Sequence, residues 1–267
     1  MTIPEKYDQR AQAIDSLLCV GLDSDLSRLP QQFLSEENPQ WSFNRHVIDR
    51  THPYAAAFKI NTAFYEAQGV LGWQAMLSTV AYLRAQHPDI LTICDAKRAD
   101  IGNTSTAYAH AIFDELGFDA VTLQPYLGQD ALQPFLDRQD KGCIILCRTS
   151  NPGSGEFQSL NVNGRPLWQH IAEQVRDHWN FNQNCMLVVG ATYPDELRAA
   201  RQTVGDMTLL VPGVGSQGGD VTAVIQAGSN SDGRGLIINA SRSIIFADDP
   251  AQAAADTQQA INAVRNT

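Results

Sequence analysis

The sequence predicts a single-domain (β/α)8 barrel over residues 1–267. Eight short, nearly continuous apolar segments recur along the chain, and segments with helical features lie between most of them. Polar and charged residues cluster directly after these apolar segments. In a barrel of parallel strands, the carboxyl ends of the strands meet at one mouth, where active sites lie. We therefore expect a barrel with its active site at that mouth, and an open doubly wound sheet is the alternative.

Each expected strand is short and bounded by turn residues, which is typical of parallel strands buried on both faces. The eight segments are Leu17–Leu22, Ala55–Ile60, Ile90–Cys94, Ala120–Leu123, Cys143–Cys147, Cys185–Val189, Leu209–Val211 and Leu236–Ile238. Two of the expected helices open with Pro, which the first helical turn tolerates. The expected helices are Thr104–Leu116, Leu167–Trp179, Pro194–Gln202 and Pro250–Val264.

The overall charge restricts the classes of partner. The chain carries 29 acidic and 19 basic residues, a formal net charge of −10. This balance argues against nucleic acid and against an anionic membrane surface, since both require a basic surface. No apolar run reaches the roughly 18 residues of a membrane span, and the first residues lack the apolar stretch of a signal peptide. The five scattered cysteines indicate reduced thiols, so we expect a cytoplasmic protein.

The most informative segment is residues 94–104, Cys-Asp-Ala-Lys-Arg-Ala-Asp-Ile-Gly-Asn-Thr. Asp95 and Lys97 are two residues apart at the end of an expected strand, so their side chains should share one face. The strand should then break at Asp100 and Gly102. Burying a carboxylate and an ammonium is costly unless they pair. Taken alone, the segment fits a functional role, in proton chemistry or in binding an anionic ligand, as well as it fits a structural ion pair.

Further polar residues follow the first two expected strands. Asp23 follows the first, and Lys59 and Asn61 lie at the end of the second. A lone lysine at a strand end is usually a solvated charge. Lys59, Asp95, Lys97 and Asp100 together, however, are two cations and two anions that could share one pocket at zero net charge.

The loops after the seventh and eighth expected strands contain candidate phosphate ligands. Gly213, Gly215 and Gly218 have the spacing of a dinucleotide fingerprint, but they follow the seventh expected strand. In a barrel, the loops after strands seven and eight commonly bind phosphate through backbone N–H groups, and a plain tight turn is the remaining interpretation. Arg242 follows the eighth strand and could bind a phosphate bidentately.

A long loop follows the fifth expected strand. Residues 149–155, Thr-Ser-Asn-Pro-Gly-Ser-Gly, open a long polar loop that extends to about Pro166, and loops of this kind often act as lids or binding loops. The histidines have no metal-ligand spacing, so we expect no metal.

The motif Asp-x-Lys-x-x-Asp-Ile-Gly-x-Thr at residues 95–104 resembles orotidine 5′-phosphate decarboxylase. The Phe-Lys-x-Asn of the second strand, the Thr-Ser-Asn-Pro-Gly loop, Pro-Gly-Val-Gly followed by Gln217, and the late Ser-Arg also resemble that family. The length and the Cys-Asp-Ala-Lys-Arg-Ala-Asp segment resemble its longer bacterial subfamily. The resemblance runs from Asp23 to Arg242.

The resemblance implies a cofactor-free decarboxylation of orotidine 5′-phosphate, the last step in making UMP, by a cytoplasmic homodimer. It also assigns roles to individual residues. The implied catalytic residues are Lys59, Asp95, Lys97 and Asp100. The implied substrate-binding residues are Asp23 (with Lys59) for the ribose, Ser150 for the pyrimidine, and Gln217 and Arg242 for the phosphate, together with Asn61 and Thr104. Thr104 and Asp100 would enter the site of the neighbouring subunit.

The residues fit this chemistry independently. Loss of CO₂ from C6 leaves a carbanion whose lone pair lies in the ring plane, so a fixed cation must stabilise it, and Lys97 could do so and then donate the proton. One alternative is a metal-dependent sugar-phosphate decarboxylase or aldolase of the same superfamily, in which we expect an acidic residue where Lys59 stands. Another is a non-catalytic phosphate-binding barrel, which would not need Lys97 beside Asp95.

Overall fold

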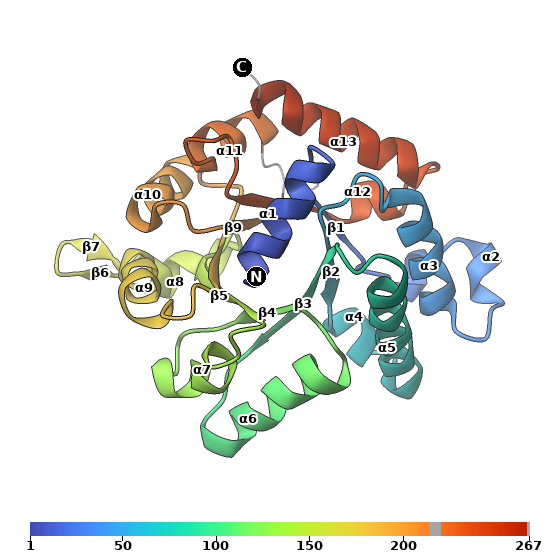
Figure 1. The fold of residues 1–267 in the computed structure, drawn as a ribbon, viewed down its shortest axis with the longest axis horizontal. Helices are drawn as coiled ribbons and strands as arrows, with labels where there is room; N and C mark the ends of the chain where they lie inside the picture. The colour runs from blue at the N-terminus through green and yellow to red at the C-terminus, as the bar shows by residue number, and fades with distance from the viewer. Residues whose placement is uncertain (214–219, 266–267) are drawn as a thin grey trace.

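The computed structural model describes residues 1–213 and 220–265 and shows a closed barrel of eight parallel strands (Figure 1). Each segment expected to be a strand coincides with one strand of the barrel, which confirms the predicted fold class. Going around the barrel, the order is β1, β10, β9, β8, β5, β4, β3, β2. The barrel strands are β1 Leu18–Gly21, β2 Ala57–Asn61, β3 Leu91–Arg98, β4 Ala120–Leu123, β5 Gly142–Arg148, β8 Cys185–Val189, β9 Leu209–Pro212 and β10 Leu236–Ala240.

Helices surround the barrel, and a small hairpin projects from the loop after β5 (Figure 1). The expected helix at 104–116 is α6 continued by a π-helical turn, and that at 167–179 is α9 continued in the same way. The helices of four or more residues are α1 Ile3–Ala13, α2 Gln31–Leu34, α3 Pro39–Thr51, α4 Ala63–Glu66, α5 Gly69–Gln86, α6 Gly102–His110, η2 Ala111–Glu115, α7 Gln129–Leu136, α8 Gly155–Gln158, α9 Leu167–Gln174, η4 Val175–Trp179, α10 Pro194–Val204, α11 Val221–Gly228, α12 Arg242–Ile245 and α13 Pro250–Arg265. The shorter elements are the 3-10 turns η1 Leu26–Arg28 and η3 Pro152–Ser154, and the hairpin strands β6 Asn161–Val162 and β7 Arg165–Pro166.

Helix α1 covers the amino-terminal end of the barrel (Figure 1). The fully buried Tyr7 donates a hydrogen bond from Oη to the carbonyl of Leu236, at 2.7 Å. Lys6 forms an ion pair with Asp119 over 2.9 Å. Because α1 covers this end, access to the barrel is left to the carboxyl ends of the strands.

Strand register brings the polar residues of the first three strands together. Gly21 pairs with Lys59, and Asn61 pairs with Asp95. The barrel core consists mainly of buried Ile, Val, Leu and Ala side chains, so these charged groups lie at the edge of an apolar interior. Within the described ranges, no helix is both long and apolar enough to cross a membrane.

Candidate active site

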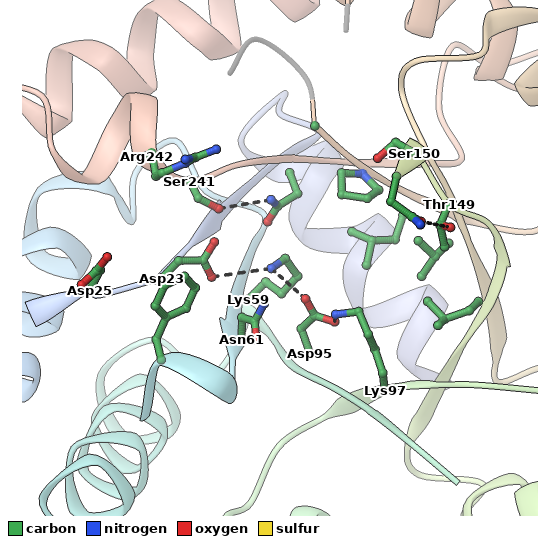
Figure 2. A pocket seen from close by; sticks show the side chains of 18 of the residues that line it. Asp23, Asp25, Lys59, Asn61, Asp95, Lys97, Thr149, Ser150, Ser241 and Arg242 are labelled. Carbon is green, nitrogen blue, oxygen red and sulfur yellow. Dashed lines mark hydrogen bonds and ion pairs between the residues drawn. The ribbon is translucent and has the colours of Figure 1, made fainter. Parts of the chain in front are cut away.

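A cavity of about 580 Å³ opens at the carboxyl ends of the barrel strands (Figure 2). Its walls include most of the residues expected from the sequence, together with an apolar floor. The described lining residues are Asp23, Asp25, Arg28, Lys59, Asn61, Phe64, Asp95, Lys97, Leu146, Thr149, Ser150, Asn151, Val188, Leu210, Pro212, Gly213, Asn239, Ser241, Arg242 and Phe246.

Asp95 links the two lysines of the cavity. Its Oδ2 lies 3.3 Å from Lys59 Nζ, and its Oδ1 lies 2.7 Å from Lys97 Nζ. Lys59 also faces Asp23 Oδ1 at 3.8 Å, so Figure 2 shows it between two carboxylates. The Lys59 side chain is only 5% exposed, whereas that of Lys97 is 48% exposed. Lys97 is therefore the cation of this group that a ligand in the cavity can reach most easily.

The pairing controls the protonation of these groups. Burial disfavours the ammonium of Lys59, but the carboxylates of Asp23 and Asp95 outweigh this effect and raise its pKa above the ordinary value. Burial likewise disfavours the Asp95 carboxylate, but Lys59, Lys97 and the hydrogen bond from Thr122 outweigh it and lower the pKa of Asp95 to about 2. Both groups are therefore charged at neutral pH.

The backbone of β3 is irregular where it carries these residues. Its pairing with β4 shifts register between Cys94 and Arg98, and Lys97 has a φ of 48°. A left-handed conformation is uncommon for a lysine and costs about 1–2 kcal/mol. Thr122 holds this turn, because its Oγ1 accepts from Lys97 N at 3.0 Å and donates to Asp95 Oδ1 at 2.9 Å. The expected meeting of Asp95 and Lys97 thus occurs through a bulge rather than through regular strand alternation.

Two polar groups at the ends of β1 and β2 face the cavity. Asp23 Oδ1 is buried and has no hydrogen-bond partner among the described residues, apart from the more distant Lys59. A buried acceptor of this kind is costly unless a ligand donates to it. Asn61 Oδ1 accepts from the backbone of Ala63 at 3.2 Å, which fixes the amide at the cavity wall.

The other side of the cavity is formed by the loops after β5 and β10. Ser150 and Thr149 line it from the first loop, and Arg242 lines it from the start of α12. Arg242 lies across the cavity from Lys97 (Figure 2). The arrangement leaves space for an elongated ligand with an anionic group near Arg242. Gln217 lies outside the described residues, as do Gly215 and Gly218.

The structure of one chain does not bring Asp100 and Thr104 into this cavity. Asp100 follows β3, where its Oδ1 accepts from the backbone of Ile101 at 2.7 Å. Thr104 is exposed on α6. The described lining therefore holds three carboxylates and four cations, rather than the balanced set expected from the sequence.

Sequence reasoning did not identify Thr122, Asp25, Arg28 or Asn239 as site residues. Arg28 lies 4.5 Å above the ring of Phe246, which holds it at the edge of the cavity. Their positions in the sequence could have indicated two of them, because Asp25 closely follows Asp23 and Asn239 directly follows the eighth expected strand segment. Within residues 1–213 and 220–265, no three His, Cys, Asp or Glu side chains are grouped so that they could hold a metal ion.

Comparison with known proteins gives consistent matches. A family model described as orotidine 5′-phosphate decarboxylase / HUMPS family matches residues 16–257. Orotidine 5′-phosphate decarboxylase of Cellvibrio japonicus is 46% identical over 259 residues, covering 95% of this chain and 94% of the relative. The enzyme of the same name from Herpetosiphon aurantiacus is 50% identical over 244 residues, covering 91% and 89%. The solved structure of Leishmania donovani OMP decarboxylase matches with a TM-score of 0.89 at 39% identity, covering 100% of both chains.

Proposed function

Because this chain belongs to the orotidine 5′-phosphate decarboxylase / HUMPS family, it decarboxylates orotidine 5′-phosphate to UMP in pyrimidine biosynthesis, and we propose that Lys97 stabilises and then protonates the C6 carbanion. The observation that carries this assignment is the position of the Lys97 ammonium. It is 2.7 Å from Asp95, yet nearly half of the Lys97 side chain is exposed, and Lys97 lines the cavity.

In the proposed step, the bond between C6 and the carboxylate carbon breaks, CO₂ leaves, and the electron pair stays on C6. The lone pair lies in the ring plane, so the ring π system cannot delocalise it. Lys97 Nζ then donates a proton to C6 and recovers one from solvent. A fixed cation in a site of low dielectric stabilises such developing charge without reorganisation, which is usually the largest contribution to catalysis.

Repulsion between Asp95 and the substrate carboxylate is a smaller contribution. Two unit charges 4 Å apart interact by about 4 kcal/mol at an effective dielectric of 20. Enzymes typically lower barriers by about 8–23 kcal/mol, so this repulsion alone is too weak. The preorganised charge of Lys97 and the binding energy of the phosphate must supply most of the difference.

We propose nucleotide contacts along the length of the cavity. Asp23 and Lys59 would bind the ribose hydroxyls, and Asn61 would contribute from the end of β2. Ser150 would contact the pyrimidine. Arg242 would bind the phosphate together with Gln217. The excess of cations in the described lining supports binding of a strongly anionic substrate by a protein with a net charge of −10.

We propose that the enzyme is a homodimer in which Asp100 and Thr104 complete the partner's site. Their position outside the cavity of their own chain supports this arrangement. Exposed apolar side chains follow Asp100 and β4, with Ile101 62% exposed and Tyr126 85% exposed. A second subunit would cover such a surface.

We further propose that residues 1–267 act as one domain in the cytoplasm, with neither a metal nor an organic cofactor. All five cysteines are free and buried, which supports a reducing compartment. Asp23 and Asp95 are both paired with the buried ammonium of Lys59, which supports an arrangement in which these carboxylates do not bind a metal ion.

The test is a spectrophotometric assay of the purified protein with orotidine 5′-phosphate after exhaustive treatment with EDTA. We expect complete conversion to UMP at the rate of untreated protein. Loss of activity that Mg²⁺ restores would instead indicate metal-dependent chemistry, and no conversion under either condition would refute the assigned reaction.

A further inference from the structure

The loop after β5 is attached to the barrel through residues that do not line the cavity. Leu146 lines the cavity, and regular alternation would point Arg148 in the same direction. The pairing of β5 with β8 instead shifts register between these two residues. Such bulges re-aim side chains and are common next to active sites. As a result, Arg148 is absent from the described lining and is buried behind it, at 4% exposure.

Arg148 joins the loop to the start of α10. Its Nε donates to the carboxylate of Glu196, and its guanidinium lies 4.4 Å from the ring centroid of Tyr193. On the loop side, its Nη1 donates to Gln158 Oε1 at 3.2 Å and to Ser154 Oγ. A buried guanidinium with one carboxylate partner needs these additional acceptors, so the loop is held in the geometry that supplies them.

Gln158 connects this anchored part of the loop to Thr149, which lines the cavity. Its Oε1 accepts from Thr149 N at 2.9 Å, and its Nε2 donates to Thr149 Oγ1 at 2.9 Å. The residue adjoining Ser150 is thus bound at both its backbone and its side chain. These bonds fix the direction in which the chain enters the turn at residues 149–151.

Gly190 fixes the same turn from the other side. Its N–H donates to the carbonyl of Arg148 at 2.8 Å, directly after β8. A Cβ at residue 190 would lie 2.9 Å from Ser150 Cβ and 3.0 Å from Ser150 N. Backbone and Cβ atoms cannot give way as the end of a flexible side chain can. Only glycine allows the Ser150 backbone to lie this close to the end of β8.

We propose that Arg148 and Gly190 are positioning residues that hold Ser150 against the end of β8, at the distance required for its contact with the pyrimidine. Neither residue would touch the substrate. The inference rests on the proposed contact of Ser150, and it adds the elements that place this side chain.

The primary test is a double-mutant cycle of Gly190→Ala and Ser150→Ala, measured as kcat/KM for orotidine 5′-phosphate. A lost hydrogen bond to the substrate corresponds to roughly a three- to tenfold reduction, and we expect each single variant to lose at least that much. Because both changes would remove the same contact, the double variant should lose little more than the worse single variant. Gly155→Ala is the matched control, since its added Cβ would approach nothing closer than 3.8 Å and its activity should remain normal.

Losses that multiply in the double variant, or a Gly190→Ala enzyme with normal kcat/KM, would overturn the proposal. So would a normal Ser150→Ala enzyme beside an impaired Gly190→Ala enzyme. Failure of the wild-type chain to convert orotidine 5′-phosphate would refute the proposed function itself, which keeps the two failures distinguishable.

Arg148→Met provides an independent test that does not crowd the turn. We expect its kcat/KM to fall by roughly three- to tenfold, and the loss should be largely absent when Ser150 is already Ala. Arg165→Met is the control, because Arg165 is 48% exposed and pairs with Glu173 at the surface. If Arg148→Met lowers the melting temperature while its kcat/KM stays normal, Arg148 has only a structural role and the proposal is wrong.

Discussion

Replacing Asp95 with asparagine removes the negative charge that Lys59 and Lys97 share, and the effect on stability should depend on pH. The pKa of Asp95 is lowered from its usual 3.8 to about 2. At about 1.36 kcal/mol per pKa unit, this lowering corresponds to about 2 kcal/mol of folding free energy at neutral pH. Because the folded-state pKa is the lower one, this stabilisation is fully present above about pH 5. It is lost as the pH falls through 3.8 towards 2.

The assay is urea unfolding of the wild type and Asp95→Asn between pH 7 and pH 3. The pH-dependent part of the difference between the two proteins should shrink by about 1 kcal/mol over this range, since only part of the titration is complete at pH 3. Asp140→Asn is the control, because the Asp140 side chain is 68% exposed and its pair with Arg138 spans 3.6 Å. A constant difference between wild type and Asp95→Asn from pH 7 to pH 3 would refute the coupling of Asp95 to the two lysines.

Two further predictions concern binding and assembly. Arg242→Ala should weaken the use of orotidine 5′-phosphate by about 1.5–3 kcal/mol in kcat/KM but leave the use of phosphate-free orotidine nearly unchanged, and equal losses for both would mean that Arg242 is structural. Mixing inactive Lys97→Ala and Asp100→Ala subunits should restore activity at about a quarter of all sites, because one site of each mixed dimer receives both intact residues. With subunit exchange verified by tagged chains, no recovery would show that Asp100 acts within its own chain.

The barrel could be predicted from the sequence because its strands are buried on both faces. Such strands appear as short apolar runs, and their polar ends mark the mouth. Lys59 lies near the end of one of these runs. Asp23, Asp95, Lys97 and the residues after β5 and β10 lie just beyond the others. Their meeting in one cavity follows from the closure of the barrel and requires no detailed knowledge of side-chain packing.

Other parts of the site depend on contacts that strand patterns do not encode. The bulge in β3 and the positive φ of Lys97 break the alternation on which sequence reasoning relies, and Thr122 holds them from a different strand. The pairing of Arg148 with Glu196 spans 48 residues and depends on a second bulge. The expectation for Asp100 concerns a second subunit, so neither the strand pattern nor the structure of one chain tests it.

The direct test of the central claim is the Lys97→Ala variant, measured for both turnover and UMP binding. Loss of a proton donor and of a fixed cation should reduce kcat by at least about 10³-fold, while calorimetric binding of UMP and the melting temperature stay close to wild type. Lys6→Ala is the control, since Lys6 pairs with Asp119 at the opposite end of the barrel and should leave kcat unchanged. A Lys97→Ala enzyme that converts orotidine 5′-phosphate at a near-normal rate would contradict the proposed mechanism.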